Sequence, residues 1–327
     1  MVRSFVTPTV VVSRCIEFDH CRWNGDMITS HIVDRLKEFV DFIPVCAEME
    51  MGLGVPRDPI RIVGGKAGEH LIQPATGRDV SDEMTLFAES FLDTLPPVDG
   101  FILKNKSPSC GVKEVKVYAG PDKGGSIGKT DGFFARAVLA RYPDMPVEDE
   151  GRLRNMRIRD HFLTRLYTFS EFQTVQASER LNALVRFHSE NKLMLMAHNQ
   201  TLEREMGRTV ANPDRIAPAL VLERYREQLI HALSTAPRYT ANINVLLHAS
   251  GYFRDRLNHE EKAFFLDAVQ KYREGRVSIC APKNILKAWI VRFGEENLDN
   301  QTFFAPYPDQ LMELDPLDLD RGRDLWT

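Results

Sequence analysis

Cysteine is the residue type with the most distinctive chemistry in this chain of 327 residues, and it occurs five times. The five are Cys15, Cys21, Cys46, Cys110 and Cys280. An odd number of thiols without a Cys-x-x-C pair does not fit a disulfide framework, a zinc ribbon or a thioredoxin-type dithiol. Buried free thiols, metal ligands and catalytic thiols remain as interpretations.

Three of the cysteines follow short apolar runs of the kind that form buried strands. The pairs are Thr9–Ser13 with Cys15, Phe42–Val45 with Cys46, and Gly100–Leu103 with Cys110. Because loops at the carboxyl ends of parallel strands converge on one edge of a sheet, these three thiols can meet. Three thiolates can hold an iron–sulfur cluster and leave one iron open as a Lewis acid with an affinity for soft sulfur. The alternative is that they are small buried hydrophobic residues.

The remaining two cysteines are harder to assign. Cys21 follows Cys15 by six positions, so it is either a ligand or a neighbour in the same loop. Cys280 precedes an Ala-Pro pair in the second half of the chain and is predicted to be a packing residue.

One acid and one arginine lie near Cys46 in the sequence. Glu48 follows Cys46 by two positions, so we expect it to face the same cavity, where a carboxylate can orient water or pass a proton. The alternative for Glu48 is a solvated loop acid. Arg57 stands in a Gly- and Pro-rich turn and can bind a substrate anion or pair with Asp58.

The segment Gly124–Thr130 ends in Gly-Lys-Thr and resembles a nucleotide-binding P-loop. The motif needs four residues between its glycines, but only three separate Gly124 from Gly128, and Lys123 stands where glycine is required. We therefore predict no nucleoside triphosphate site and interpret the segment as a turn beside the active site.

Apolar runs in the first half alternate with helical patterns, which predicts an α/β domain with a mainly parallel, Rossmann-like sheet. Besides the runs named above, the expected elements are helices at 28–40, from Ser81 onward and at 133–140, and an edge strand at Val115–Tyr118. The second half holds only long helical patterns. These fall at Leu153–Phe169, Gln176–His198, Ala219–Leu233, Tyr239–Leu257 and His259–Arg273. We therefore predict an α/β domain over 1–150 and an all-α domain over 151–327 with an acidic C-terminal tail.

Charge is unevenly distributed along the chain. Residues 151–290 hold 22 Lys and Arg against 14 Asp and Glu, so they carry +8 within a chain whose net charge is −4. The densest basic cluster is Arg152, Arg154, Arg157 and Arg159. Such a segment can be the electrostatic footprint of a polyanion or simply a solvated helical surface. If these residues are helical, Arg152 shares a face with Arg159, and Arg154 shares one with Arg157.

Several short motifs of the first half resemble those of the thiouracil desulfidase family. They are Ser13-Arg14-Cys15, Cys21-Arg22-Trp23-Asn24-Gly25, Val45-Cys46-Ala47-Glu48, Gly52-Leu53-Gly54-Val55-Pro56-Arg57 and the segment Lys104–Gly111. The second half resembles the helical YbgA-like domain that is often fused to this family. The combination is similar to the bacterial tRNA 4-thiouridine desulfidases.

This resemblance implies a four-iron, four-sulfur cluster held by Cys15, Cys46 and Cys110, with the fourth iron open to the sulfur of the substrate. It also implies catalytic roles for Glu48 and Ser107, with Ser109 as the alternative serine. The reaction implied is a non-redox, hydrolytic desulfuration of 4-thiouridine in tRNA, which gives uridine and hydrogen sulfide.

Two other functions fit the sequence. One is a desulfidase that acts only on free 2- or 4-thiouracil or on thionucleosides. The other is a non-catalytic RNA-binding or sulfur-carrier protein that uses its thiols for persulfide transfer. No stretch approaches the roughly 18 consecutive apolar residues of a membrane span, and the N-terminal residues lack a secretory pattern, so we expect a cytoplasmic protein without a membrane partner.

Overall fold

The computed structural model describes residues 3–65, 68–122 and 124–312. The chain divides into two compact units, of which one is Thr7–Leu166. The other runs onward from Tyr167 and includes the N-terminal segment through Val6. The last part of the predicted acidic tail, from residue 313 on, lies outside the described residues, as does Lys123.

The first sheet of the Thr7–Leu166 unit has four strands, and every neighbouring pair is parallel. In spatial order they are β2 (Asp41–Val45), β1 (Thr9–Ser13), β6 (Gly100–Leu103) and β9 (Val147–Asp149). Val10, Val11 and Val12 in β1 are fully buried, as expected for a central parallel strand covered on both faces. Pro44 is tolerated because β2 is an edge strand, where a missing N–H can face away from the ladder.

A second sheet of five strands in the same unit is mixed. In spatial order they are β5 (Arg78–Asp79), β4 (Gly68–Gln73), β3 (Arg61–Gly65), β7 (Val115–Tyr118) and β8 (Ser126–Thr130). Only β3 and β7 pair in parallel. The expectation that Val115–Tyr118 is an edge strand is wrong, because β7 lies between β3 and β8. Its alternation reflects one buried face, since Val115 and Val117 are buried.

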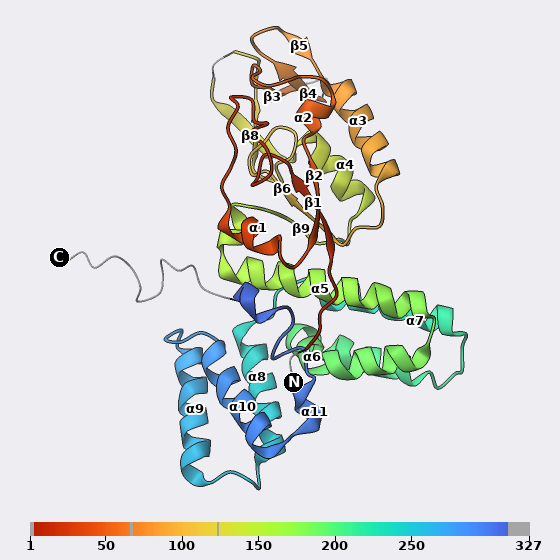
Figure 1. Ribbon diagram of the computed structural model, residues 1–327, viewed down its shortest axis with the longest axis vertical. Helices are drawn as coiled ribbons and strands as arrows, with labels where there is room; N and C mark the ends of the chain where they lie inside the picture. The colour runs from red at the N-terminus through yellow and green to blue at the C-terminus, as the bar shows by residue number, and fades with distance from the viewer. Residues whose placement is uncertain (1–2, 66–67, 123, 313–327) are drawn as a thin grey trace, which may run out of the picture. The chain divides into compact units, whose positions relative to one another are not determined.

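Helices complete this unit, and Figure 1 shows α3 and α4 side by side. The helical elements are α1 (His31–Leu36), α2 (Ala47–Glu50), α3 (Ser81–Thr94), α4 (Phe133–Arg141), a 3-10 turn at Arg152–Arg154 and the first part of α5 (Met156–Ser178). Phe87 and Phe91 of α3 pack their rings against Phe134 of α4. These rings belong to the core that also holds Val11 and Phe101 of the parallel sheet.

Every regular element assigned to the second unit's described residues is a helix, and loops connect these helices. Besides the rest of α5, its elements are α6 (Leu181–Ala211), α7 (Pro218–Ala232), α8 (Tyr239–Ser250), a 3-10 turn (Gly251–Phe253), α9 (His259–Arg273), α10 (Cys280–Phe293), α11 (Glu296–Asp299) and a 3-10 turn (Asp309–Met312). The predicted fold class, an α/β part followed by a helical part, is confirmed. Within the described part of the chain, no helix combines the length and apolarity that crossing a bilayer requires.

Two local signals explain helix boundaries in this unit. Asn258 and Glu261 form a reciprocal capping box at the start of α9. α6 is broken at Asn199, whose side chain accepts the hydrogen bond of the Leu202 N–H and so restarts the helix.

The prediction that Cys280 packs internally is wrong. It is exposed as the first residue of α10, and the Ala-Pro pair lies in the first turn of this helix, where proline is tolerated.

Candidate active site

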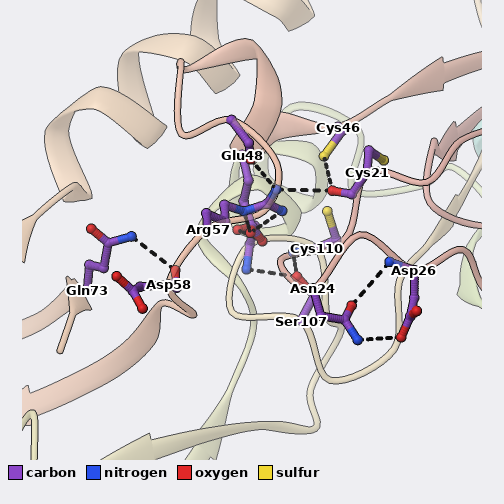
Figure 2. Close-up of polar contacts among 12 residues, drawn as sticks. Cys21, Asn24, Asp26, Cys46, Glu48, Arg57, Asp58, Gln73, Ser107 and Cys110 are labelled. Atoms are coloured by element: carbon purple, nitrogen blue, oxygen red, sulfur yellow. Dashed lines mark hydrogen bonds and ion pairs between the residues drawn. The ribbon is translucent and has the colours of Figure 1, made fainter. Parts of the chain in front are cut away.

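Four buried thiols gather where three strands of the parallel sheet end. Cys15 lies just after β1, Cys46 directly follows β2, and Cys110 lies in the loop after β6. Cys21 comes from the long turn that follows Cys15, and its thiol is within hydrogen-bonding reach of both Cys15 and Cys46. Figure 2 shows Cys46 and Cys110 with their sulfur atoms facing each other and Cys21 beside them. The expected convergence of distant cysteines therefore occurs, and it includes Cys21.

A cavity of about 540 Å³ opens beside these thiols. All four cysteines line it, and so do Glu48, Arg57 and Ser107. The remaining lining residues include a cluster of basic and aromatic side chains, namely Arg22, Trp23, Lys104, Lys106 and Arg154. A volume of this size is typical of small-molecule sites and exceeds what a lone pyrimidine base needs. Ser109 does not line the cavity, because it is fully buried behind the wall.

The environment of the thiols favours their neutral form. Burial raises the pKa of Cys110 to about 12, although hydrogen bonds from the Ser13 and Ser107 hydroxyls oppose the shift. A hydrogen bond with Cys15 is the largest cause that raises the pKa of Cys21 to about 11, and burial adds to it. Hydrogen bonding with Cys21 and burial raise the pKa of Cys46. These three thiols stay protonated at neutral pH unless a bound cation replaces their protons.

Glu48 is held from both sides at the start of α2. Its Oε2 accepts hydrogen bonds from Nε and Nη2 of Arg57, at 2.9 and 2.7 Å. Its Oε1 accepts one from the Ser109 hydroxyl at 2.9 Å. Glu48 thus faces the cavity, as the sequence predicts, and is not a solvated loop acid. Arg57 pairs with Glu48 rather than with Asp58, a partner that no local pattern indicates.

The two candidate serines occupy different places. The Ser107 hydroxyl lines the cavity and accepts the backbone N–H groups of Ser109 and Cys110, both at 3.2 Å. This capping fixes the turn that presents Cys110. Ser109 instead lies under Glu48. Ser13, the last residue of β1, also lines the cavity, but the sequence analysis does not name it as a site residue. Its position at the end of a strand is the same signal that indicates Cys15.

The loop that carries Cys110 packs closely against the start of α4. A Cβ at Gly132 would lie 2.4 Å from the carbonyl oxygen of Ser109, closer than any side chain allows. Gly132 also donates its N–H to the Gly111 carbonyl at 2.7 Å. Glycine at position 132 is therefore required for the position of Cys110.

The four predicted RNA-binding arginines do not lie on one helix. Arg152 and Arg154 belong to a 3-10 turn, and α5 begins only at Met156, so the expected pairing of helix faces is wrong. Arg152 forms an ion pair with Glu148, and Arg159 donates a hydrogen bond to the Leu153 carbonyl at 3.4 Å. Of the four arginines, Arg154 alone lines the cavity described above.

The Gly124–Thr130 segment does not form a phosphate loop. Residues Ser126–Thr130 are β8, which pairs antiparallel with β7. None of its residues lines the cavity, so the interpretation as a turn beside the active site is wrong. Strand geometry does not provide the ring of backbone N–H groups that cradles phosphates.

Known proteins match both parts of the chain. Residues 10–150 match the model of a family described as 2-thiouracil desulfurase. YbbK of Bacillus subtilis is 32% identical over 157 residues, which span 45% of this chain and 99% of YbbK. The chain belongs to the 2-thiouracil desulfurase family. The predicted membership is thereby confirmed.

Residues 192–308 match a second family, described as a protein of unknown function (DUF1722). YbgA of Escherichia coli is 27% identical over 154 residues, which span 46% of this chain and 91% of YbgA. The predicted fusion of a desulfidase part with a YbgA-like part is confirmed. Among solved structures, a [4Fe-4S]-dependent thiouracil desulfidase, TudS, is 28% identical with a TM-score of 0.36, covering 45% of this chain and 93% of TudS.

Proposed function

We propose that this desulfurase-family protein removes sulfur from 4-thiouridine in tRNA, with a four-iron, four-sulfur cluster held by Cys15, Cys46 and Cys110. The products are uridine and hydrogen sulfide. The observation that carries the proposal is the gathering of buried thiols at one cavity together with Glu48 and Ser107.

The donor set fits an iron–sulfur cluster. Thiolates are the usual ligands of such clusters, and the thiols here come from separate loops around one space. Within the described residues, no three His, Cys, Asp or Glu side chains are arranged to hold a single metal ion. A cluster makes a different demand, because each cysteine binds a different iron. Cys21 lines the same cavity, and it is either a further ligand of the cluster or a neighbour of the ligands.

The reaction is a hydrolysis in which C=S and water become C=O and hydrogen sulfide, with no net electron transfer. When bound, the cluster supplies a Lewis-acidic iron with an affinity for the substrate's sulfur. Glu48 accepts a proton from water and directs the water oxygen at the ring carbon. Ser107 donates a hydrogen bond to the base and to the charge that develops on it.

Features of the cavity wall support a nucleotide within RNA as the substrate. Arg22, Lys106 and Arg154 can neutralise phosphates, and Trp23, which is 44% exposed, offers a face on which an unstacked base can lie.

The test is nucleoside mass spectrometry of thiolated tRNA after incubation with anaerobically reconstituted protein. We expect loss of 4-thiouridine with the wild-type protein and none with Cys110→Ala. Free 4-thiouridine and 2-thiouracil are run in parallel. Turnover of the free compounds with no change in tRNA would replace the proposal with the free-substrate alternative.

The sulfur-carrier alternative needs a nucleophilic thiolate to form a persulfide. It also predicts colourless protein, whereas the proposed cluster gives a brown protein whose iron can be quantified.

A further inference from the structure

Arg57 carries a charge that is almost removed from solvent, since its side chain is only 4% exposed. A buried cation is costly unless its N–H groups are bonded. Two of them meet Oε2 of Glu48. Two more come from Nη1, which donates to the carbonyl oxygens of Gly54 and Cys21 at 2.8 and 3.1 Å. Four of the five N–H groups of a guanidinium are thus engaged within the protein.

This bonding leaves little capacity for a substrate anion. One N–H remains, whereas recognition of a phosphate or carboxylate by arginine commonly uses two parallel N–H groups. The contacts therefore favour a structural task for Arg57 over the anion-binding role that its sequence motif allows.

The pair of bonds to Oε2 sets the orientation of the Glu48 carboxylate. Arg57 holds Oε2 from one side and the Ser109 hydroxyl holds Oε1 from the other, so the carboxyl group cannot rotate. A carboxylate oxygen has two lone-pair sites, and Ser109 uses one on Oε1. The other site on Oε1 is available for a water molecule.

The hydrogen bond from Arg57 to the Cys21 carbonyl connects Glu48 with the cysteine loop. The Cys21 carbonyl accepts Nη1 of Arg57 and also lies 3.8 Å from Sγ of Cys46. Figure 2 shows this arrangement, with the dashed lines from Arg57 leading to Glu48 and to Cys21. One side chain thus fixes the acid relative to the thiol-bearing loops.

We propose that Arg57 is the positioning residue of this site, which holds the Glu48 carboxylate in register with the cysteine loop and acts on the reaction only through Glu48. This inference rests on the proposed desulfuration for its kinetic arm. It assigns no contact between Arg57 and the substrate.

The kinetic arm compares Arg57→Met and Arg57→Lys with Arg61→Met. Arg61 is a matched control because its guanidinium lies over the Tyr118 ring and donates to the Asp122 carbonyl, away from the site. We expect kcat to fall about 100-fold for Arg57→Met, the scale of a misplaced catalytic group, with KM changed less than about threefold. Lysine keeps the charge but not the two-pronged geometry, so Arg57→Lys also loses kcat. Added methylguanidine should restore activity to Arg57→Met, and a large rise in KM with kcat unchanged would overturn the proposal.

A double-variant cycle tests whether Arg57 acts through Glu48. If it does, Glu48→Gln combined with Arg57→Met is no slower than Glu48→Gln alone. Losses that multiply would show an independent role for Arg57 and overturn the proposal.

The last arm needs no activity. In the iron-free protein we measure the rate at which iodoacetamide labels Cys21, mapped by peptide mass spectrometry. Loss of the bond to the Cys21 carbonyl should speed labelling in Arg57→Met at least about tenfold, as local opening becomes easier, while Arg61→Met stays at the wild-type rate. Equal labelling rates in all three proteins would contradict the proposed role of Arg57 in holding the cysteine loop. If wild-type protein desulfurises nothing, the proposed function fails and this arm still decides the role of Arg57.

Discussion

Ser109 and Glu48 lie 61 positions apart in the chain, and their side chains are joined by a hydrogen bond of 2.9 Å. Ser109 is fully buried, so this hydroxyl meets the acid from behind the cavity wall. Ser107, two residues earlier, lines the cavity and caps the turn before Cys110. The structure thus separates the two serines by what each can touch, and only Ser107 is placed to meet a substrate.

Replacing these serines by alanine should therefore give different kinetic defects. Ser107→Ala removes a donor from the cavity, and we expect kcat to fall about 100-fold, the scale seen for a lost oxyanion donor. Ser109→Ala leaves Arg57 holding the other oxygen of Glu48, so we expect a loss of about tenfold. Sulfide release from thiolated substrate measures both. A larger loss for Ser109→Ala would reverse the assignment.

The iron content of alanine variants should distinguish the cysteines that bind the cluster from those that do not. We expect alanine at Cys15, Cys46 or Cys110 to abolish stoichiometric iron binding after anaerobic reconstitution, because three ligands are the minimum proposed. Cys280→Ala, which changes an exposed thiol, is the control and should keep full iron content. Cys21→Ala should also keep its iron. Loss of iron in Cys21→Ala would show that the cluster has a fourth ligand.

Gly132→Ala should distort the loop of Cys110. The added methyl group would lie 2.4 Å from the Ser109 carbonyl oxygen, and neither backbone segment can move freely. We expect a loss of roughly 1–3 kcal/mol in the free energy of unfolding, as for other overpacked sites. Urea denaturation measures it. Gly124→Ala is the matched control because nothing lies within 4 Å of its added Cβ, and equal losses in both variants would contradict the steric argument.

Arg154 and Arg152 should differ in their effect on tRNA binding. Arg154 lines the cavity, whereas the charge of Arg152 is offset by its ion pair with Glu148. We expect Arg154→Ala to weaken tRNA binding and to reduce the salt dependence by about one phosphate contact, with little change for Arg152→Ala. Filter binding over a salt series measures both, and activity on free 4-thiouridine should be spared. Identical salt slopes for wild type and Arg154→Ala would exclude that contact.

The helical unit should lose stability in mild acid because of His188. Burial lowers the pKa of His188 from 6.5 to about 4, while the Tyr225 hydroxyl lies 3.1 Å from its Nδ1. Below pH 6.5 the unfolded chain takes up a proton at this histidine that the folded chain does not. The contribution of neutral His188 to the free energy of unfolding is therefore complete above pH 6.5 and is lost as the pH falls toward 4.

The expected loss from His188 is roughly 1–2 kcal/mol between neutral pH and about pH 5. Urea denaturation of wild type and of His188→Gln at the two pH values measures it. The variant should show a smaller pH effect, and His231→Gln, at an exposed position on α7, should behave as wild type. A His188→Gln protein with the full pH effect would assign the loss to other groups.

The sequence predicts three strands of the parallel sheet, β1, β2 and β6, because they contain short apolar runs, but it misses β9, which holds two acids in three residues. The rule that strand ends converge then brings Cys15, Cys46 and Cys110 to one edge. The second sheet was largely missed. Its strands β3, β4 and β8 contain glycine or charged residues and are paired mostly as hairpins, so their stability comes from cross-strand partners rather than from a local pattern.

The interior of the site was predictable only in part. Glu48 was found because it lies near Cys46 in the sequence. Arg57 and Ser109 were named in the sequence, but their contacts with Glu48 were not predicted, because each contact depends on how three loops pack together. Likewise, charge density drew attention to four arginines, but a turn before Met156 decides that only Arg154 reaches the cavity.

The unit that carries the site ends inside α5 rather than at a linker. The first turns of that helix supply Leu163 and Leu166, which are buried, and Leu166 lies against Gly100 of the central sheet. A shortened chain that stops at residue 150, where the family match ends, would lack these leucines and would expose this part of β6 to solvent. A truncated protein that contains the desulfurase half should therefore end beyond Leu166 and include the first turns of α5.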